Sequence, residues 1–189
     1  MTKDVFCDQM WLTYKARFNA HSRLLRQEIL YTVTIAFLSF FVIVLNILQL
    51  MPVILEIRQE ATTFYTITIS IFILVVSLIN NSSARRRNAE QFHACALEIK
   101  SLYGEFSAVL EDMTNENYSN FIQRYSAIVR KYDINHQKCD YQQVLVDQGK
   151  TISKDKFCFY VKYYIVNYFL CSMLLVLPVV FGLIIIFSS

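Results

Sequence analysis

This sequence has little glycine, little proline and, over three long stretches, no charge. Only 3 of its 189 residues are glycine and 2 are proline, and 55% are hydrophobic, whereas an ordinary soluble domain is roughly 45–50% apolar. No Asp, Glu, Lys or Arg lies between Glu28 and Glu56, between Glu60 and Arg85, or after Lys162. Each stretch exceeds the roughly 20 residues that an α-helix needs to cross a bilayer. The stretches therefore predict an integral membrane protein, and a very apolar soluble bundle is the alternative.

Motifs of catalysis, cofactor binding and disulfide bonding are also missing. The chain has no G-x-S-x-G, no Gly-rich phosphate loop and no H-E-x-x-H, so we expect neither an enzyme nor a bound cofactor. Its five cysteines include no C-x-x-C pair, which argues against a disulfide framework. The conceivable metal ligands are His21, His93, Cys95, His136 and Cys139. Zinc ligands usually come in two tight pairs; these pairs are loose, so core packing and ordinary polar contacts are favoured.

The N-terminal segment, residues 5–28, has the pattern of an amphipathic helix. Apolar residues recur at spacings of three, four and seven, at Trp11, Tyr14, Phe18, Leu25 and Ile29. Mostly off that stripe, and so expected on a polar face, are the basic residues Lys15, Arg17, Arg23 and Arg26. We expect this helix to continue directly into the first membrane span.

Three predicted spans and their basic flanks define a topology. The spans are Leu30 to about Leu50, roughly Thr62 to Leu78, and Tyr164 to Phe187 with an interruption at Pro178. Lys and Arg lie before the first span and after the second, whereas the short loop between these two spans carries only Arg58. Because such residues concentrate on the cytoplasmic side, we expect both flanks inside the cell and the loop outside. A re-entrant third segment is the alternative to a full crossing.

The triplet Arg85, Arg86 and Arg87 stands where the second span leaves the membrane. We interpret it as a topological stop at the cytoplasmic headgroups, where anionic lipid favours each basic residue by about 1 kcal/mol. Nucleic-acid binding is the alternative for such a triplet. Topology alone accounts for three basic residues at a membrane exit, so we do not expect direct nucleic-acid binding.

The middle third of the chain predicts three more helices. After the arginines, apolar residues keep a period of about 3.6 residues as far as Leu110, and the next helix should begin at Thr114 or Asn115. After a polar linker over 133–140, a short helix should end near Gly149. Because apolar stripes seek burial, these helices form a small bundle or an oligomer interface.

The predicted fold is thus an all-α integral membrane protein with four parts. They are a cytoplasmic amphipathic helix (1–29), a transmembrane hairpin (30–84), a cytoplasmic helical region (85–160) and a third transmembrane helix (161–189). The polar side chains in the second span are weak ones, and Thr63, Thr66, Ser70 and Ser77 fall near one helical face. Such hydroxyls commonly hold helices together or bond their own backbone; the alternative is that they line a weakly selective pore. No charged residue lies within a span, which argues against a proton-coupled carrier or a voltage sensor.

Three segments carry a family resemblance: WLTYKARFNAHSRLLRQ before the first span, RRRNAEQFHACALEIKSLYGEF after the second, and YSAIVRKYDINHQKCDYQQV further on. Over roughly residues 10–150 they resemble the SLATT family, the SMODS and SLOG-associating two-transmembrane effector domains, and within it the branch often encoded beside reverse transcriptases. The most specific matching residues are Arg87, Glu90, Phe92, His93, Cys95, Glu98, Tyr103, Asn135, His136, Asp140 and Tyr141. The third predicted span departs from the family's pattern of two.

The resemblance implies a membrane effector of a bacterial antiviral defence system. Such a multi-pass protein of the bacterial inner membrane would oligomerise in the lipid bilayer and form or open a membrane-disrupting pore when a partner senses infection, which stops growth by abortive infection. The expected partners are further copies of the chain and a cytoplasmic defence protein such as a reverse transcriptase or a nucleotide-signalling enzyme. A non-conducting membrane anchor or sensor that recruits a cytoplasmic partner is the second interpretation.

Overall fold

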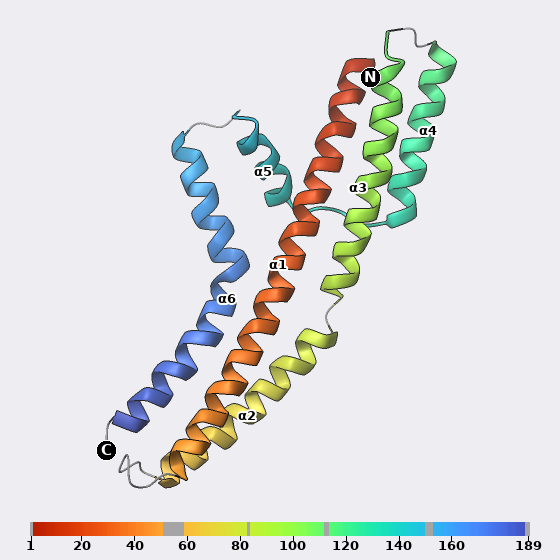
Figure 1. Ribbon diagram of the computed structural model, residues 1–189. Coiled ribbons are helices and arrows are strands. Elements are labelled where there is room, and N and C mark those ends of the chain that lie inside the picture. The colour runs from red at the N-terminus through yellow and green to blue at the C-terminus, as the bar shows by residue number, and fades with distance from the viewer. Residues whose placement is uncertain (1, 51–58, 83, 112–113, 150–152, 188–189) are drawn as a thin grey trace. The chain divides into compact units, whose positions relative to one another are not determined.

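The computed structural model describes residues 2–50, 59–82, 84–111, 114–149 and 153–187. Within these ranges the chain forms six helices and no strand, which confirms the predicted all-α fold (Figure 1). The helices are α1 (Lys3–Gln49), α2 (Gln59–Ser82), α3 (Arg85–Ala108), α4 (Asn115–Tyr132), α5 (Lys138–Asp147) and α6 (Ser153–Phe187). The predicted outer loop around Arg58 lies outside the described residues.

The chain divides into two compact units, and each of them gathers segments that are distant in the sequence. The bundle unit comprises Met1–Arg26 and Ala84–Val161, and the span unit comprises Gln27–Ser83 and Lys162–Ser189. Both α1 and α6 contribute to both units. As predicted, the N-terminal helix continues into the first span, because α1 is a single helix of 47 residues.

The core of the bundle unit lies between the first part of α1, α3 and α4. Its buried residues are Phe6, Met10, Tyr14, Cys95, Ala96, Ile99, Leu102 and Phe106. Those from α3 follow the helical period, which confirms the predicted apolar stripe of this helix as far as Phe106. Ile99 and Phe106 are enclosed by the chain's own helices, so this stripe packs within a bundle, and an oligomer interface stays a prediction.

The helix α4 covers this core with its predicted apolar face. Partly buried against the core are Tyr118, Phe121, Ile122, Tyr125, Ile128, Val129 and Tyr132. The ring of Phe106 meets those of Phe6 and Phe121 edge-on, with centroids 5.2 Å and 5.3 Å away, an arrangement that aromatic pairs favour. In Figure 1, α3 and α4 accordingly lie side by side.

The ends of α4 and α5 follow capping chemistry. Thr114 is the N-cap of α4, and its hydroxyl accepts a backbone N–H of the first turn at 3.3 Å. The linker is shorter than the predicted 133–140, because the backbone N–H of Gln137 donates to Oδ2 of Asp140 at 2.9 Å and so starts α5 within it. Gly149, with a φ of 71°, follows the end of α5 as expected.

The buried face of α1 differs from the predicted apolar stripe. Arg17 and Arg23, expected on a polar face, are only 2% and 4% exposed. Conversely, Leu25 and Ile29, expected on the buried stripe, are 37% and 53% exposed. The prediction was wrong for the two arginines because Arg23 finds a carboxylate inside the bundle unit and Arg17 contacts the Cys95 thiol there.

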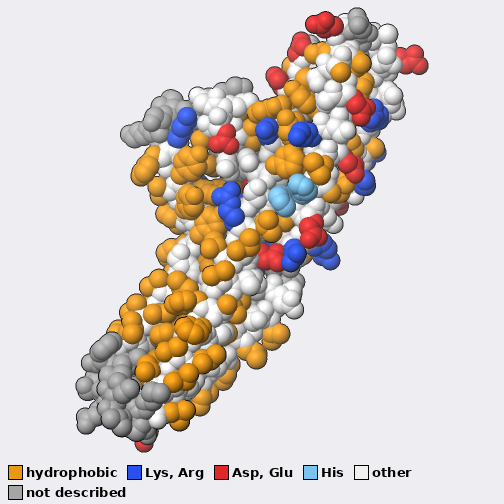
Figure 2. Space-filling model, in the orientation of Figure 1, with side chains coloured by type: hydrophobic (Ala, Val, Ile, Leu, Met, Phe, Trp, Pro, Cys, Tyr) orange, Lys and Arg blue, Asp and Glu red, His pale blue; other side chains and the backbone are white. Residues whose placement is uncertain are grey.

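The span unit packs the second part of α1 against α2 and α6. A buried cluster of Val42, Leu45, Tyr65 and Ile69 holds α1 and α2 together. On the face shown in Figure 2, hydrophobic side chains cover most of this unit, and charged side chains gather on the bundle unit. Two helical stretches are long and apolar enough to cross a membrane, one in α1 and one that begins at Glu60. Exposed apolar surface of this extent fits lipid, so the chain is a membrane protein.

The helix α6 continues through Pro178, which corrects the interruption predicted there. Proline removes one helical N–H, a loss that membrane bundles tolerate. Separately, the Tyr65 hydroxyl of α2 donates to the Pro178 carbonyl and so ties α6 to α2 at this position. A Cβ at Gly182 would lie 3.0 Å from the Phe41 ring, so glycine permits the close approach of α6. The described apolar stretch of α6, Cys171–Ile184, is shorter than a span, and a third crossing stays a prediction.

Candidate functional site

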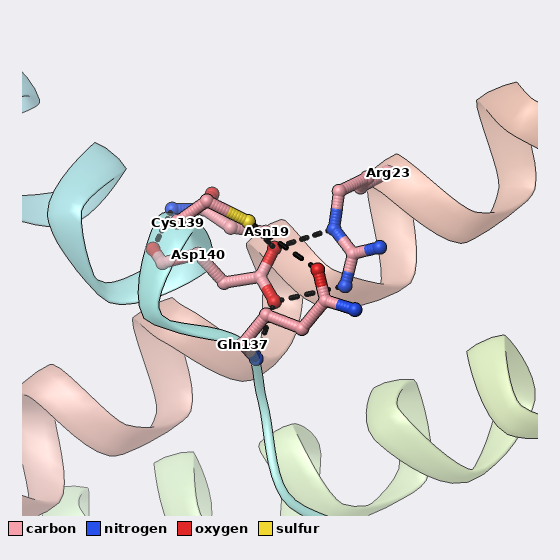
Figure 3. Close-up of polar contacts among 5 residues, drawn as sticks. All are labelled: Asn19, Arg23, Gln137, Cys139 and Asp140. Carbon is pink, nitrogen blue, oxygen red and sulfur yellow. Dashed lines mark hydrogen bonds and ion pairs between the residues drawn. The ribbon is translucent and has the colours of Figure 1, made fainter. Parts of the chain in front are cut away.

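A buried ion pair joins α5 to α1 in the bundle unit. Arg23 donates from Nε to Oδ1 of Asp140 at 2.8 Å and from Nη2 to Oδ2 at 3.0 Å (Figure 3). The side chains of Arg23 and Asp140 are enclosed, with 4% and 0% of their surface exposed. The planar fork of a guanidinium matches a carboxylate in this two-bond geometry. The pair therefore fixes the orientation of α5 on α1 as well as its distance.

Asp140 is also the centre of the other polar contacts that attach α5. Its Oδ2 accepts the backbone N–H of Gln137, and its backbone carbonyl accepts Nδ2 of Asn19 at 3.2 Å. Asn19 lies four residues before Arg23, so both project from the same face of α1. One carboxylate thus serves the first turn of α5 and its attachment to α1, and its loss would leave a buried guanidinium without a partner.

Cys139 lies beside this ion pair. Its Sγ is 3.6 Å from Oε1 of Gln137 and 3.9 Å from Oδ1 of Asp140 (Figure 3). Burial, followed by the negative charge of Asp140, raises the pKa of the Cys139 thiol, and Arg23 opposes this more weakly. The thiol therefore stays protonated at neutral pH and acts as a weak donor to the neighbouring oxygens.

A second buried guanidinium, that of Arg17, lacks a carboxylate. Its Nη1 donates to Sγ of Cys95 on α3, and its Nε is buried without a hydrogen-bond partner in the described structure. Burial raises the pKa of Cys95 more than the charge of Arg17 lowers it. Cys95 is therefore a neutral thiol, which is a weak acceptor.

His136 lies in the segment before α5, where the charges of both Arg17 and Asp140 act on its pKa. Burial is the largest effect on its pKa and lowers it, Arg17 lowers it further, and Asp140 opposes both. The imidazole is therefore neutral at pH 7. Its Nδ1 is buried and has no hydrogen-bond partner among the described residues.

The other two histidines, His21 on α1 and His93 on α3, are in contact with each other. The rings of His21 and His93 are 4.7 Å apart, and His93 also packs against Phe18 at 5.6 Å. Nδ1 of His21 lies 2.9 Å from the carbonyl oxygen of Ala89. Within the described chain, no group of three or more His, Cys, Asp and Glu side chains could hold a metal ion.

On the outer side of the bundle unit, Glu98 joins α3 to α4. Its Oε1 accepts Lys131 Nζ at 2.5 Å and the Tyr132 hydroxyl at 2.7 Å. These hydrogen bonds, that of Lys131 first, lower the pKa of Glu98. Tyr103 forms a hydrogen bond with Cys7 of α1. Burial raises the pKa of the Cys7 thiol, and this hydrogen bond lowers it by a smaller amount.

The family-motif residues divide between the interior and the surface. Buried or half-buried are Phe92, Cys95, Glu98, Tyr103, His136 and Asp140. Exposed are Arg87, Glu90, His93, Asn135 and Tyr141, and of these Glu90 forms a surface ion pair with Arg86 at 3.4 Å. Cys95 and Asp140 contact two arginines of α1, Arg17 and Arg23 respectively, and the charges of Arg17 and Asp140 both act on the pKa of His136.

Sequence reasoning missed Asn19, Arg17 and Arg23 as members of this site. A signal for Arg17 was present, because it follows Met10 by seven residues and Tyr14 by three and so continues their helical face. Its charge placed it on the polar face instead. Arg23 has its acidic partner 117 residues away, so no local pattern indicates the pair.

The four hydroxyl residues that were predicted to share one face of α2 lie in different surroundings in the structure. Thr66 is buried and donates to the carbonyl of Thr63, and Ser70 donates to the carbonyl of Thr66, at 3.0 Å and 2.6 Å. Ser70 and Ser77 line a groove of about 520 Å³ between α1 and α2, together with Ser39 and six large apolar residues. Thr63 is exposed and Thr66 does not line this groove. That these hydroxyls line a pore stays a prediction.

The fold and the site define an all-α membrane protein with two parts, a packed helical bundle and a set of membrane-spanning helices. A family model described as SMODS and SLOG-associating 2TM effector domain family 5 matches residues 3–184. Since the match spans nearly the whole chain, the protein belongs to this family of two-transmembrane effector domains. Neither a search of curated proteins nor a search of solved structures gave a match.

Proposed function

We propose that the protein is the pore-forming membrane effector of a bacterial antiviral defence system. The observation that carries this proposal is its membership of the two-transmembrane effector family, over residues 3–184. The apolar, exposed surfaces of α1 and α2 support action inside a lipid bilayer. When a partner senses infection, the effector opens the inner membrane to ions and stops growth before the virus spreads.

Conduction by this chain requires several copies. The hairpin and α6 together offer too few helices to enclose a water path, so the pore is built by oligomerisation. The groove between α1 and α2 is mostly apolar, but Ser39, Ser70 and Ser77 bring three hydroxyl residues to it, which supports a weakly polar path on this side of the hairpin. Small hydroxyl residues also let membrane helices approach one another closely.

We infer that the bundle unit lies in the cytoplasm and that α6 crosses the membrane a third time. The Lys and Arg residues that flank the hairpin support this topology. The bundle unit is then available to a cytoplasmic partner such as a reverse transcriptase or a nucleotide-signalling enzyme. The resemblance to the branch encoded beside reverse transcriptases favours the first of these.

A non-conducting anchor or sensor is the second candidate, and one observation favours it. The hydroxyls of Thr66 and Ser70 donate to carbonyls of their own helix, which is what serine and threonine do in membrane helices without any pore. In that case the bundle unit recruits a partner to the membrane and the helices only hold it there.

A membrane-potential dye separates the two functions. Cells express the chain alone or with the candidate partner enzyme, and the partner is then activated by infection. A pore predicts depolarisation that requires both proteins and precedes growth arrest. Growth arrest with an unchanged membrane potential would overturn the pore and leave the anchor.

A further inference from the structure

Two histidines that are far apart in the sequence meet at the surface of the bundle unit. His21 belongs to α1 and His93 to α3, and the centroids of their rings are 4.7 Å apart. His93 is exposed and His21 is half-buried, and on the face shown in Figure 2 the visible histidine side chains lie together at the surface. The pair can therefore be reached by an ion from solution.

The hydrogen bond of His21 decides which of its ring nitrogens can bind a metal. Nδ1 of His21 lies 2.9 Å from the carbonyl oxygen of Ala89. A carbonyl only accepts hydrogen bonds, so Nδ1 carries the proton and the lone pair of the neutral ring is on Nε2. Histidines that bind metals commonly donate their other ring N–H to a backbone carbonyl in this way, so His21 has the hydrogen bonding of a metal ligand.

The geometry of α3 places His93 against the same ring. His93 follows Ala89 by four residues, so the two lie on one face of α3, and the side chains of a helix lean back over the preceding turn. The ring of His93 thus meets His21 at the turn whose carbonyl holds His21. Phe18 packs against the His93 ring in a T-shaped contact, with centroids 5.6 Å apart. Neighbours therefore hold both rings in place, and such support is what keeps a metal site precise.

The separation of the two rings suits one shared ion. With metal–nitrogen distances of about 2.0–2.1 Å, the centres of two imidazoles on one ion lie roughly 4.5–5.2 Å apart for angles of about 90–109° at the metal. The observed 4.7 Å falls within this range. We propose that His21, through Nε2, and His93 bind a single divalent transition-metal ion of the zinc type. Imidazole nitrogens suit such ions, whereas Mg²⁺ and Ca²⁺ take oxygen ligands.

The ion joins α1 to α3 at the surface of the bundle unit. Because the described residues include no group of three or more His, Cys, Asp and Glu side chains that could hold a metal, water completes its coordination. The two histidines come together only when α1 and α3 are packed, so the ion binds the folded bundle unit in preference to the unfolded chain and stabilises it. This proposal does not rest on the pore.

The site can be tested on the full chain, without a polyhistidine tag, in detergent micelles. The single tryptophan of the sequence, Trp11, packs against the core of the bundle unit, so its fluorescence reports the unfolding of that unit. Zn²⁺ and Mg²⁺ are titrated separately at constant ionic strength, which holds the screening of surface charges fixed. Zn²⁺ should give a saturable rise in melting temperature of roughly 5 °C at a hundred times its dissociation constant, and Mg²⁺ should give none.

Variants assign the rise to the pair. His93→Ala removes one ligand at an exposed position, so the chain should still fold and should bind Zn²⁺ roughly a hundredfold more weakly, because two ligands no longer act together. His21→Ala should weaken Zn²⁺ binding to the same extent. His136→Gln is the matched control for a histidine outside the pair, and Cys139→Ser is the control for a half-buried thiol, since thiolates also bind zinc. Both controls should keep the full rise.

Three outcomes would overturn the proposal. A melting temperature that does not respond to Zn²⁺ shows that the two histidines only pack against each other. A rise that persists in both His21→Ala and His93→Ala places the ion elsewhere on the protein, and its loss in Cys139→Ser would locate it at that thiol. An equal rise with Mg²⁺ comes from the divalent charge and not from imidazole ligands.

Discussion

Replacing Asp140 by asparagine tests the role of the buried ion pair in holding α5. The substitution keeps the shape of the side chain and removes the charge that accepts two hydrogen bonds from Arg23 and one from the backbone of Gln137. Removing one partner of a buried pair leaves the other charge uncompensated, at a cost of about 3–5 kcal/mol. For a chain of this size that corresponds to a fall in melting temperature of roughly 6–20 °C.

The assay is the Trp11 fluorescence melt of the full chain in detergent. The double variant Arg23→Met with Asp140→Leu removes both charges and should recover most of the loss, because apolar groups of similar volume replace buried pairs at little cost. The exposed pair of Arg124 and Glu105 provides the control, and Glu105→Gln should stay within about 1 kcal/mol of the wild type. The buried pair does not hold α5 if Asp140→Asn melts like Glu105→Gln, or if the double variant loses as much stability as the two single variants added together.

Three further predictions address pH, packing and topology. The pKa of His136 is lower in the folded protein than the value of about 6.5 in the unfolded chain. The unfolded chain therefore binds more protons, and the melting temperature measured by Trp11 fluorescence should fall as the pH falls below about 6.5. His136→Gln should reduce this dependence of the melting temperature on pH. Gly182→Leu should displace α6, because even a Cβ there would lie 3.0 Å from the Phe41 ring. Far-UV circular dichroism should then show a lower denaturation midpoint than for the wild type, and an unchanged midpoint would count against this packing. An impermeant thiol reagent should label intact cells with a cysteine introduced at Gln59 and spare one at Asn115; labelling at Asn115 would reverse the inferred topology.

The helices of the bundle unit were predictable because their apolar residues repeat within a few positions. The stripe of α3 through Phe92, Ile99 and Phe106 is a local pattern, and burial of one face follows from it directly. The N-cap at Thr114 is a local signal of the same kind.

The polar interior was not predictable for the same physical reason. A charged residue on a helix is ordinarily solvated, and only a partner far away in sequence, such as Asp140 for Arg23, makes burial possible. Helix α6 presents the same limitation, because the contact of Tyr65 with the carbonyl of Pro178 joins residues 113 positions apart. Pattern reasoning therefore located the helices and missed the pairings that orient them.

The pore itself is tested most directly by bulk placed in the groove between α1 and α2. Ser70→Phe and Ser77→Phe fill this groove, whereas Thr68→Phe adds the same bulk at an exposed position of α2 whose hydroxyl also donates to its own helix. Apolar bulk is readily accommodated in lipid, so all three variants should insert. In infected cells that express the partner, a pore along this groove predicts that a membrane-potential dye shows depolarisation with the wild type and Thr68→Phe, and little or none with Ser70→Phe and Ser77→Phe. Equal depolarisation in all four would contradict a pore along this face of the hairpin.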